Sequence, residues 1–209
     1  MIIAVDGPTA SGKGTLAKQL ADHFGVPHLD TGLLYRAVGQ QVAIAGGDPD
    51  NEADALAACT FPDVLLEDPA LRSEGSGSLA SKVSVHPAVR EALFERQRAF
   101  ATQTGGAVLD GRDIGTVIAP DAVIKLFITA SIEERARRRF LELSGRGIET
   151  TQAETAEDIS RRDARDMNRT DAPLFPAQDA MIIDTTAFDK EQAFEAVLDA
   201  VKMRLSQNP

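Results

Sequence analysis

The sequence contains one cysteine, no tryptophan and one tyrosine among its 209 residues. A single cysteine excludes an internal disulfide, and no group of cysteines and histidines has the spacing of a zinc site. We therefore expect a cytoplasmic protein in which Cys59 is a small residue on a helix face rather than a reactive thiol. No apolar run approaches the roughly 20 residues that a transmembrane helix needs, and the N-terminus lacks the basic region of a signal peptide.

Positive charge is scarce: 22 basic residues stand against 32 acidic ones, which gives a net charge of −10. A surface this acidic repels polyphosphate backbones, so nucleic-acid binding is disfavoured. Nine of the 16 arginines nevertheless lie between Arg135 and Arg169. This clustering indicates a small anionic ligand that is bound at one place.

The pattern of apolar residues predicts an α/β fold in a single domain over residues 1–209. Apolar residues make up 43% and charged residues 26% of the chain, as in an ordinary globular protein. Strands separated by helices imply a parallel sheet with helices on both faces. Short β-branched runs predict strands at 2–5, 107–110, 123–128 and 181–184. Helical spacing predicts helices at 13–24, 33–45, 87–100, 131–143, 153–167 and 190–205.

The stretch from residue 48 to 84 is harder to interpret. Two short helical stretches surround an apolar run at 61–66. The glycines and serines of Ser73–Ser78 predict a flexible connection there. Thr31 is placed to cap the helix predicted at 33–45.

One segment has the spacing of a phosphate-binding loop, G-x-x-x-x-G-K, directly after a predicted strand and at the start of a predicted helix. Glycines let successive backbone N–H groups turn toward a phosphate, and the helix N-terminus adds partial positive charge. Lys13 would reach the outer phosphates. The predicted nucleotide site consists of Gly7, Pro8, Thr9, Ala10, Ser11, Gly12, Lys13, Gly14 and Thr15.

The residues after the lysine narrow the class of protein. Gly14 follows Lys13, so the hydroxyl that usually binds magnesium is displaced by one position to Thr15. This Gly-Lys-Gly-Thr ending resembles the nucleoside monophosphate kinases. A GTP-binding switch protein is the weaker alternative, because the near match to its guanine-reading motif at 168–171 follows a charged helix instead of a strand. An ATPase that drives conformational change would need a partner surface or repeat that is not evident.

Four motifs stand out along the chain: Gly7–Thr15, Leu29–Arg36 (LDTGLLYR), Asp110–Thr116 (DGRDIGT) and Arg162–Arg169 (RDARDMNR). Together they resemble the bacterial cytidylate (CMP) kinases. The resemblance extends from residue 2 to the last predicted strand. Adenylate kinases have Asp-Gly-Phe-Pro-Arg at the third motif, and small-molecule kinases such as shikimate kinase lack the fourth.

The resemblance implies ATP-dependent phosphorylation of CMP and dCMP to CDP and dCDP in pyrimidine nucleotide metabolism, with Mg²⁺. An acceptor such as UMP or AMP is the alternative within the same chemistry. The expected fold is that of the P-loop NTPases, with a five-stranded parallel sheet flanked by helices. A reduced acceptor-binding region would occupy about residues 38–100 and a mobile lid about residues 140–160, with Gly145 and Gly147 as its hinge. We expect a monomer that binds neither nucleic acid nor a membrane.

The resemblance also implies roles for individual residues. Arg36 and Arg112 would hold the acceptor phosphate, and Arg162, Asp166 and Arg169 would meet sugar and phosphates. The residues expected to neutralise charge during transfer are Lys13, Arg112, Arg162 and Arg169. Those expected around the cytosine are Thr31, Tyr35, Ser81, Arg90 and Asp113.

Two of these expectations carry alternatives. Asp110 ends a predicted strand beside the loop, where it would hold Mg²⁺ through water together with Thr15, or else act as a capping carboxylate. Asp113 would accept a hydrogen bond from N4 of cytosine while Arg90 donates to N3, because a carboxylate only accepts and a guanidinium only donates. Asp113 would otherwise pair with Arg112 or a neighbouring arginine to hold the loop.

Overall fold

The computed structural model describes residues 1–207 and begins with a strand, a loop and a helix. Strand β1 (Ile2–Asp6) is a run of β-branched and small residues that is buried over its last four positions. Helix α1 (Lys13–Phe24) follows, and Leu16 and Leu20 from it pack against the sheet. The predicted strand and helix at the start of the chain are therefore confirmed, with the phosphate-loop sequence between them.

The sheet has five parallel strands in the order β2-β3-β1-β4-β5. The α/β class and the parallel sheet are confirmed, but the apolar pattern missed β2, which is only three residues long. In register, Asp6 pairs with Gly111, and Asp30 pairs with Asp110, so these carboxyl ends meet at one edge. The added strands are β2 (His28–Asp30), β3 (Ala107–Gly111), β4 (Ile124–Thr129) and β5 (Met181–Asp184).

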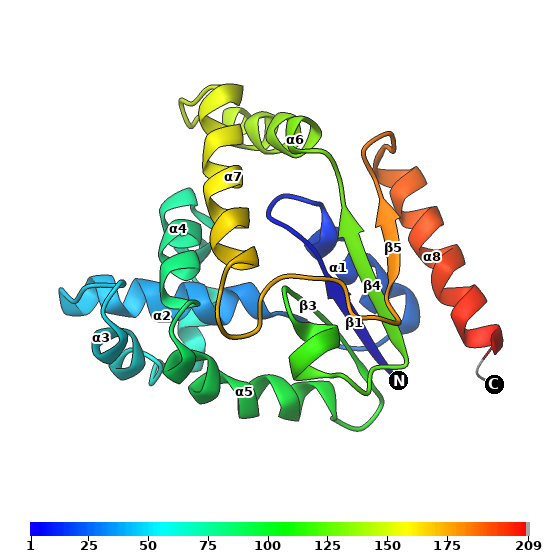
Figure 1. The fold of residues 1–209 in the computed structure, drawn as a ribbon, viewed down its shortest axis with the longest axis horizontal. Helices are drawn as coiled ribbons and strands as arrows, with labels where there is room; N and C mark the ends of the chain where they lie inside the picture. Colours follow the sequence, from blue (N-terminus) through cyan, green and yellow to red (C-terminus); the bar gives the residue numbers. More distant parts are fainter. Residues whose placement is uncertain (208–209) are drawn as a thin grey trace.

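Helices cover both faces of the sheet (Figure 1). Because side chains alternate along a strand, Val5 of β1 packs with α1 and α8, while Ala4 packs with α5 on the other face. A third apolar cluster joins the helices at 31–101 to one another. The helices are α2 (Thr31–Ala45), α3 (Glu52–Ala57), α4 (Glu74–Val83), α5 (Pro87–Ala101), α6 (Ile132–Gly145), α7 (Gln152–Met167) and α8 (Lys190–Gln207).

The predicted flexible connection at Ser73–Ser78 is wrong, because this stretch begins α4. The hydroxyl of Ser73 accepts the N–H of Ser76 at 3.2 Å and caps the helix. Packing against α2 overrides the low helix propensity of glycine and serine. The small residues let neighbouring groups approach: a Cβ on Gly77 would lie 3.2 Å from Arg162 and 3.3 Å from Arg36.

Other local features also differ from the sequence predictions or were not predicted. Helix α2 begins at Thr31 rather than two residues later, and the Thr31 hydroxyl donates to the Asp110 carbonyl at 2.8 Å instead of capping the helix. The Gly-Arg-Asp loop continues into a π-helical turn, Ile114–Ile118. Cys59 lies beyond the end of α3 rather than on a helix, and burial raises the pKa of its thiol to about 11.

We predict that Gly39→Ala destabilises the protein by about 1–2 kcal/mol, because overpacking outweighs the gain in helix propensity. A Cβ on Gly39 of α2 would lie 2.7 Å from the Cβ of Leu79 in α4. Gly75→Ala is the matched control in the same helix pair, since its Cβ would meet nothing within 4 Å. Urea denaturation followed by circular dichroism would measure both; equal stability of the two variants would contradict the close α2–α4 contact.

Candidate active site

The loop between β1 and α1 has an unusual backbone conformation at Gly7 and at Ala10. Gly7 has φ +156°, and a Cβ there would lie 2.1 Å from the carbonyl oxygen of Ile128 in β4. Ala10 has φ +59°, in the left-handed region that an L-residue adopts at a cost of about 1–2 kcal/mol. The surrounding structure must therefore hold the loop in this shape, as at many ligand-binding sites.

Lys13 begins α1 with its side chain buried beneath the loop. Its Nζ donates to the carbonyl of Pro8 at 3.3 Å. Burial lowers the pKa of Lys13 to about 7, with help from the nearby Arg112, although Asp110 and Asp30 act in the opposite direction. A cation that is desolvated in this way gains most from an incoming anion.

The loop opens into a cleft of about 920 Å³ that runs between the sheet edge, α2, α4 and α7. Of the predicted site residues, only Gly7 and Pro8 do not line it. The structure thus brings together residues from all four motifs. Those at its wall are Thr9, Ala10, Ser11, Gly12, Lys13, Gly14, Thr15, Thr31, Tyr35, Arg36, Ser81, Arg90, Asp110, Arg112, Asp113, Arg162, Asp166 and Arg169.

Arginines dominate the middle of the cleft. Arg36 donates to the carbonyls of Leu71 and Ser73 at 2.9 and 3.1 Å, and its guanidinium and that of Arg162 both lie against Gly77. Arg112 donates from Nε to Asp166 at 2.7 Å. Burial alone would raise the pKa of Asp166, but Arg112 and other nearby arginines outweigh it and leave this pKa below its ordinary value.

The far end of the cleft holds an arginine between two carboxylates. Arg90 is buried; its Nη2 donates to Asp113, and its Nε donates to Asp171 at 3.1 Å. The guanidinium also stands 5.9 Å from the ring centre of Tyr35. Asp113 therefore pairs with Arg90 and not with Arg112. Pairing with an arginine other than Arg112 was one of the alternatives that the sequence left open.

Several buried polar atoms of the cleft lack a hydrogen-bond partner within residues 1–207. Such atoms carry a free-energy penalty of about 1–3 kcal/mol each unless a ligand or water satisfies them. They occur in the phosphate loop and at the far end alike, so the cleft is suited to a ligand that is polar along its length. They are Ser11 Oγ, Ser81 Oγ, Arg90 Nη1 and Arg169 Nη2.

Asp110 is buried at the end of β3 and accepts a hydrogen bond from His28 Nε2 at 2.8 Å, whereas the N-cap positions of α1 and α2 are Gly12 and Asp30. Its Oδ2 would lie 3.5 Å from a Cβ on Gly14, which places the carboxylate beside the residue that precedes Thr15. Within residues 1–207, no group of three or more acidic, histidine or cysteine side chains could hold a metal. One or two ligands together with phosphate oxygens is the usual environment of Mg²⁺, and Asp110 and Thr15 fit it.

Some residues that line the cleft were not predicted from the sequence. Asp30 lies at the end of β2, where burial and the neighbouring Asp110 raise its pKa. Its position immediately before the Thr-Gly turn was a signal that could have indicated it. Arg139 of α6 also lines the cleft, but one arginine in a helix with three others carries no distinguishing signal.

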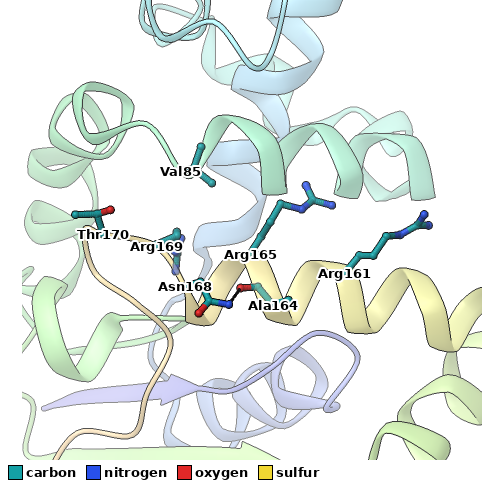
Figure 2. A pocket seen from close by; sticks show the side chains of 7 residues that line it. All are labelled: Val85, Arg161, Ala164, Arg165, Asn168, Arg169 and Thr170. Carbon is teal, nitrogen blue, oxygen red and sulfur yellow. Dashed lines mark hydrogen bonds between the residues drawn. The ribbon is translucent and has the colours of Figure 1, made fainter.

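A second, more open pocket of about 570 Å³ lies between α7 and the end of α4. Figure 2 shows Arg161 and Arg165 reaching from α7 toward the neighbouring helix. Asn168 ends α7, and its side chain donates to the Ala164 carbonyl at 2.7 Å. The near match to a guanine-reading motif thus lies at a helix end and not after a strand.

Comparison with known families agrees with this geometry. The cytidylate kinase family profile matches residues 3–203. The chain belongs to the cytidylate kinase family. Among curated members, a cytidylate kinase of Brucella suis biovar 1 is 53% identical over 208 residues, covering 99% of this chain and 95% of that protein. One from Methylocella silvestris is 55% identical over 203 residues, covering 97% and 94%.

A solved structure shares the fold at low sequence identity. An uncharacterised protein from Eubacterium ventriosum is similar with a TM-score of 0.56 and 17% identity, over 97% of this chain and 98% of that one.

The family profile and the curated relatives confirm the resemblance to the cytidylate kinases that the four motifs indicated, and they exclude the GTP-binding switch alternative. No helix within residues 1–207 is long and apolar enough to cross a membrane.

We predict that ATP binding near pH 8, without metal or acceptor, makes the protein take up about one proton. Lys13 is mostly neutral at that pH because its pKa is about 7 in the free protein, and nearby phosphates would raise that pKa. Calorimetry in buffers of different ionisation enthalpy would measure the uptake. Lys13→Met should abolish it; uptake that persists in this variant would show that another group is responsible.

Proposed function

We propose that this chain transfers a phosphoryl group from ATP to CMP and dCMP. Membership of the cytidylate kinase family supports the reaction. The observation that carries the proposal is one cleft with a phosphate loop at one end and an arginine–aspartate pair at the other. Cationic side chains lie between them, where two phosphate groups would meet.

The main obstacle to this reaction is repulsion between two polyanions. The acceptor phosphate is already an oxyanion at neutral pH, so no strong general base is required. Positioning and charge neutralisation supply most of the catalysis in phosphoryl transfer. Arg36 and Arg112 would hold the acceptor phosphate, while Lys13, Arg162 and Arg169 would neutralise the transferred group.

Mg²⁺ would be held by Thr15 and, through water, by Asp110. When bound, the ion would neutralise part of the negative charge of the phosphate groups. The hydrogen bond from His28 orients the carboxylate of Asp110 at the end of β3. Asp30 adds a second carboxylate beside it, and burial favours its neutral form.

The base would be read by Arg90 and Asp113. Their mutual hydrogen bond uses Arg90 Nη2 and Asp113 Oδ2, which leaves Arg90 Nη1 as an unsatisfied donor and Asp113 Oδ1 as an acceptor. Cytosine presents the complementary acceptor at N3 and donor at N4, whereas uracil presents the reverse. Each mismatched buried contact costs about 1–3 kcal/mol.

A coupled assay of ADP release would test the function with CMP, dCMP, UMP, AMP and GMP as acceptors. The two cytidine nucleotides should exceed the others in kcat/KM by about a hundredfold or more, which corresponds to two mismatched contacts. Comparable efficiency with UMP or AMP would reassign the acceptor. ATP hydrolysis that no monophosphate stimulates would overturn the kinase assignment.

We predict that Asp113→Asn narrows the CMP-to-UMP ratio of kcat/KM by at least about tenfold, since an amide can turn and donate to the uracil oxygen. Asp171→Asn is the control, because Asp171 also contacts Arg90 but is half exposed. It should keep most of the discrimination. If Asp113→Asn lowers kcat/KM for CMP and for UMP by the same factor, Asp113 is a purely structural partner of Arg90.

A further inference from the structure

Thr9 of the phosphate loop is held by three side chains from distant parts of the chain. Its N–H donates to Asp163 Oδ1 of α7 at 3.0 Å, and its carbonyl accepts Arg135 Nη1 of α6 at 2.9 Å. Its hydroxyl accepts Arg112 Nη2 at 3.1 Å. Both backbone polar groups of Thr9 are thus engaged by the protein.

Asp163 and Arg135 also bind each other. Arg135 Nη1 donates to Asp163 Oδ2 at 2.5 Å, and the side chains of Arg135 and Asp163 are 6% and 9% exposed, respectively. Arg135 Nε donates in addition to the carbonyl of Ala130, just after β4. One planar guanidinium therefore ties the loop, the end of β4 and α7 together, which a lysine could not do.

Asp163 and Arg135 contact the phosphate loop next to its strained residue. Ala10, next to Thr9, has the left-handed φ of +59°. Arg162 and Asp166, on either side of Asp163 along α7, line the cleft. Figure 1 shows α7, in yellow, beside the blue phosphate loop. A shift of Thr9 relative to α7 would therefore misalign the loop with the arginines that face it.

We propose that Asp163 and Arg135 are positioning residues that fix the phosphate loop against α7 for ATP binding and phosphoryl transfer. The proposal rests on the function proposed above. The pair acts on the ATP end of the cleft, because neither residue lines the cleft or contacts the acceptor end at Tyr35 and Arg90.

The test compares the two substrates in Asp163→Asn. The amide oxygen can still accept the Thr9 N–H, but its NH₂ group would face Arg135 and the ion pair is lost. We expect KM for ATP, and Kd for a non-hydrolysable ATP analogue by calorimetry, to rise about tenfold, with kcat about tenfold lower. KM for CMP should stay within about twofold.

Asp179→Asn is the matched control, since Asp179 pairs with the buried Lys125 at 2.9 Å away from the loop. Asp179→Asn should change neither KM for ATP nor KM for CMP. Arg135→Lys supplies a second test if Asp163→Asn folds poorly, because it keeps the buried charge while losing the fork that reaches Thr9. It should reproduce the ATP-specific loss.

Two results would overturn the proposal. In folded variants, equal weakening of ATP-analogue and CMP binding would indicate a general structural role, and unchanged constants would indicate no role. Failure of the proposed function would be recognised separately, because the unsubstituted protein would then fail to phosphorylate CMP whatever the variants do.

Discussion

Buried arginines that keep their charge impose the constraint on which this structure depends. A guanidinium does not lose its proton in a protein, so each buried arginine must be paired or face an anion. Asp163 pairs with the buried Arg135 and Asp113 with the buried Arg90, and Asp166 pairs with Arg112, which is partly buried. These pairs come from separate elements, so they fix the loops of the sheet edge relative to α5, α6 and α7.

The same pairs prepare the cleft for anionic ligands. Removing one partner of a buried ion pair leaves an uncompensated charge and is strongly destabilising. Carboxylates thus hold the arginines in place before substrate binds, while donors such as Arg90 Nη1 and Arg169 Nη2 remain unsatisfied. Lys13 completes the arrangement at the loop, where burial lowers its pKa. The cost of concentrating positive charge is thereby offset within the protein, and phosphate groups would supply the remaining partners.

Local patterns predicted those parts of the fold that local chemistry determines. The runs at 107–110 and 123–128 form β3 and β4 because both are mostly apolar and mostly buried in the sheet, although Asp110 ends the first and Lys125 interrupts the second. Strand β2 was not predicted from the sequence, because it has only three residues and all of them are half-buried. Helix α4 was not predicted, because its glycines and serines are typical of a loop. Its helical conformation is determined by packing against α2.

The candidate site divides in the same way. The motif residues that line the cleft were predicted because short spacings encode them, as in the phosphate loop and around Arg112. Asp163 belongs to the fourth motif, but no role was predicted for it, since nothing in the local sequence shows what an aspartate in a charged helix contacts. Its partner Thr9 is 154 positions away, so only the folded chain brings the two together. The lid around residues 140–160 and the roles of individual arginines remain predictions.

We propose that one cleft accommodates two anionic nucleotides end to end. Calorimetry with adenosine and cytidine joined through a polyphosphate bridge tests this most directly. Linking two ligands that bind adjacent sites raises affinity by about 10²–10⁴ over either alone when the bridge matches the span. We predict such a gain with one molecule bound per chain. Affinity no greater than that of ATP would contradict the account.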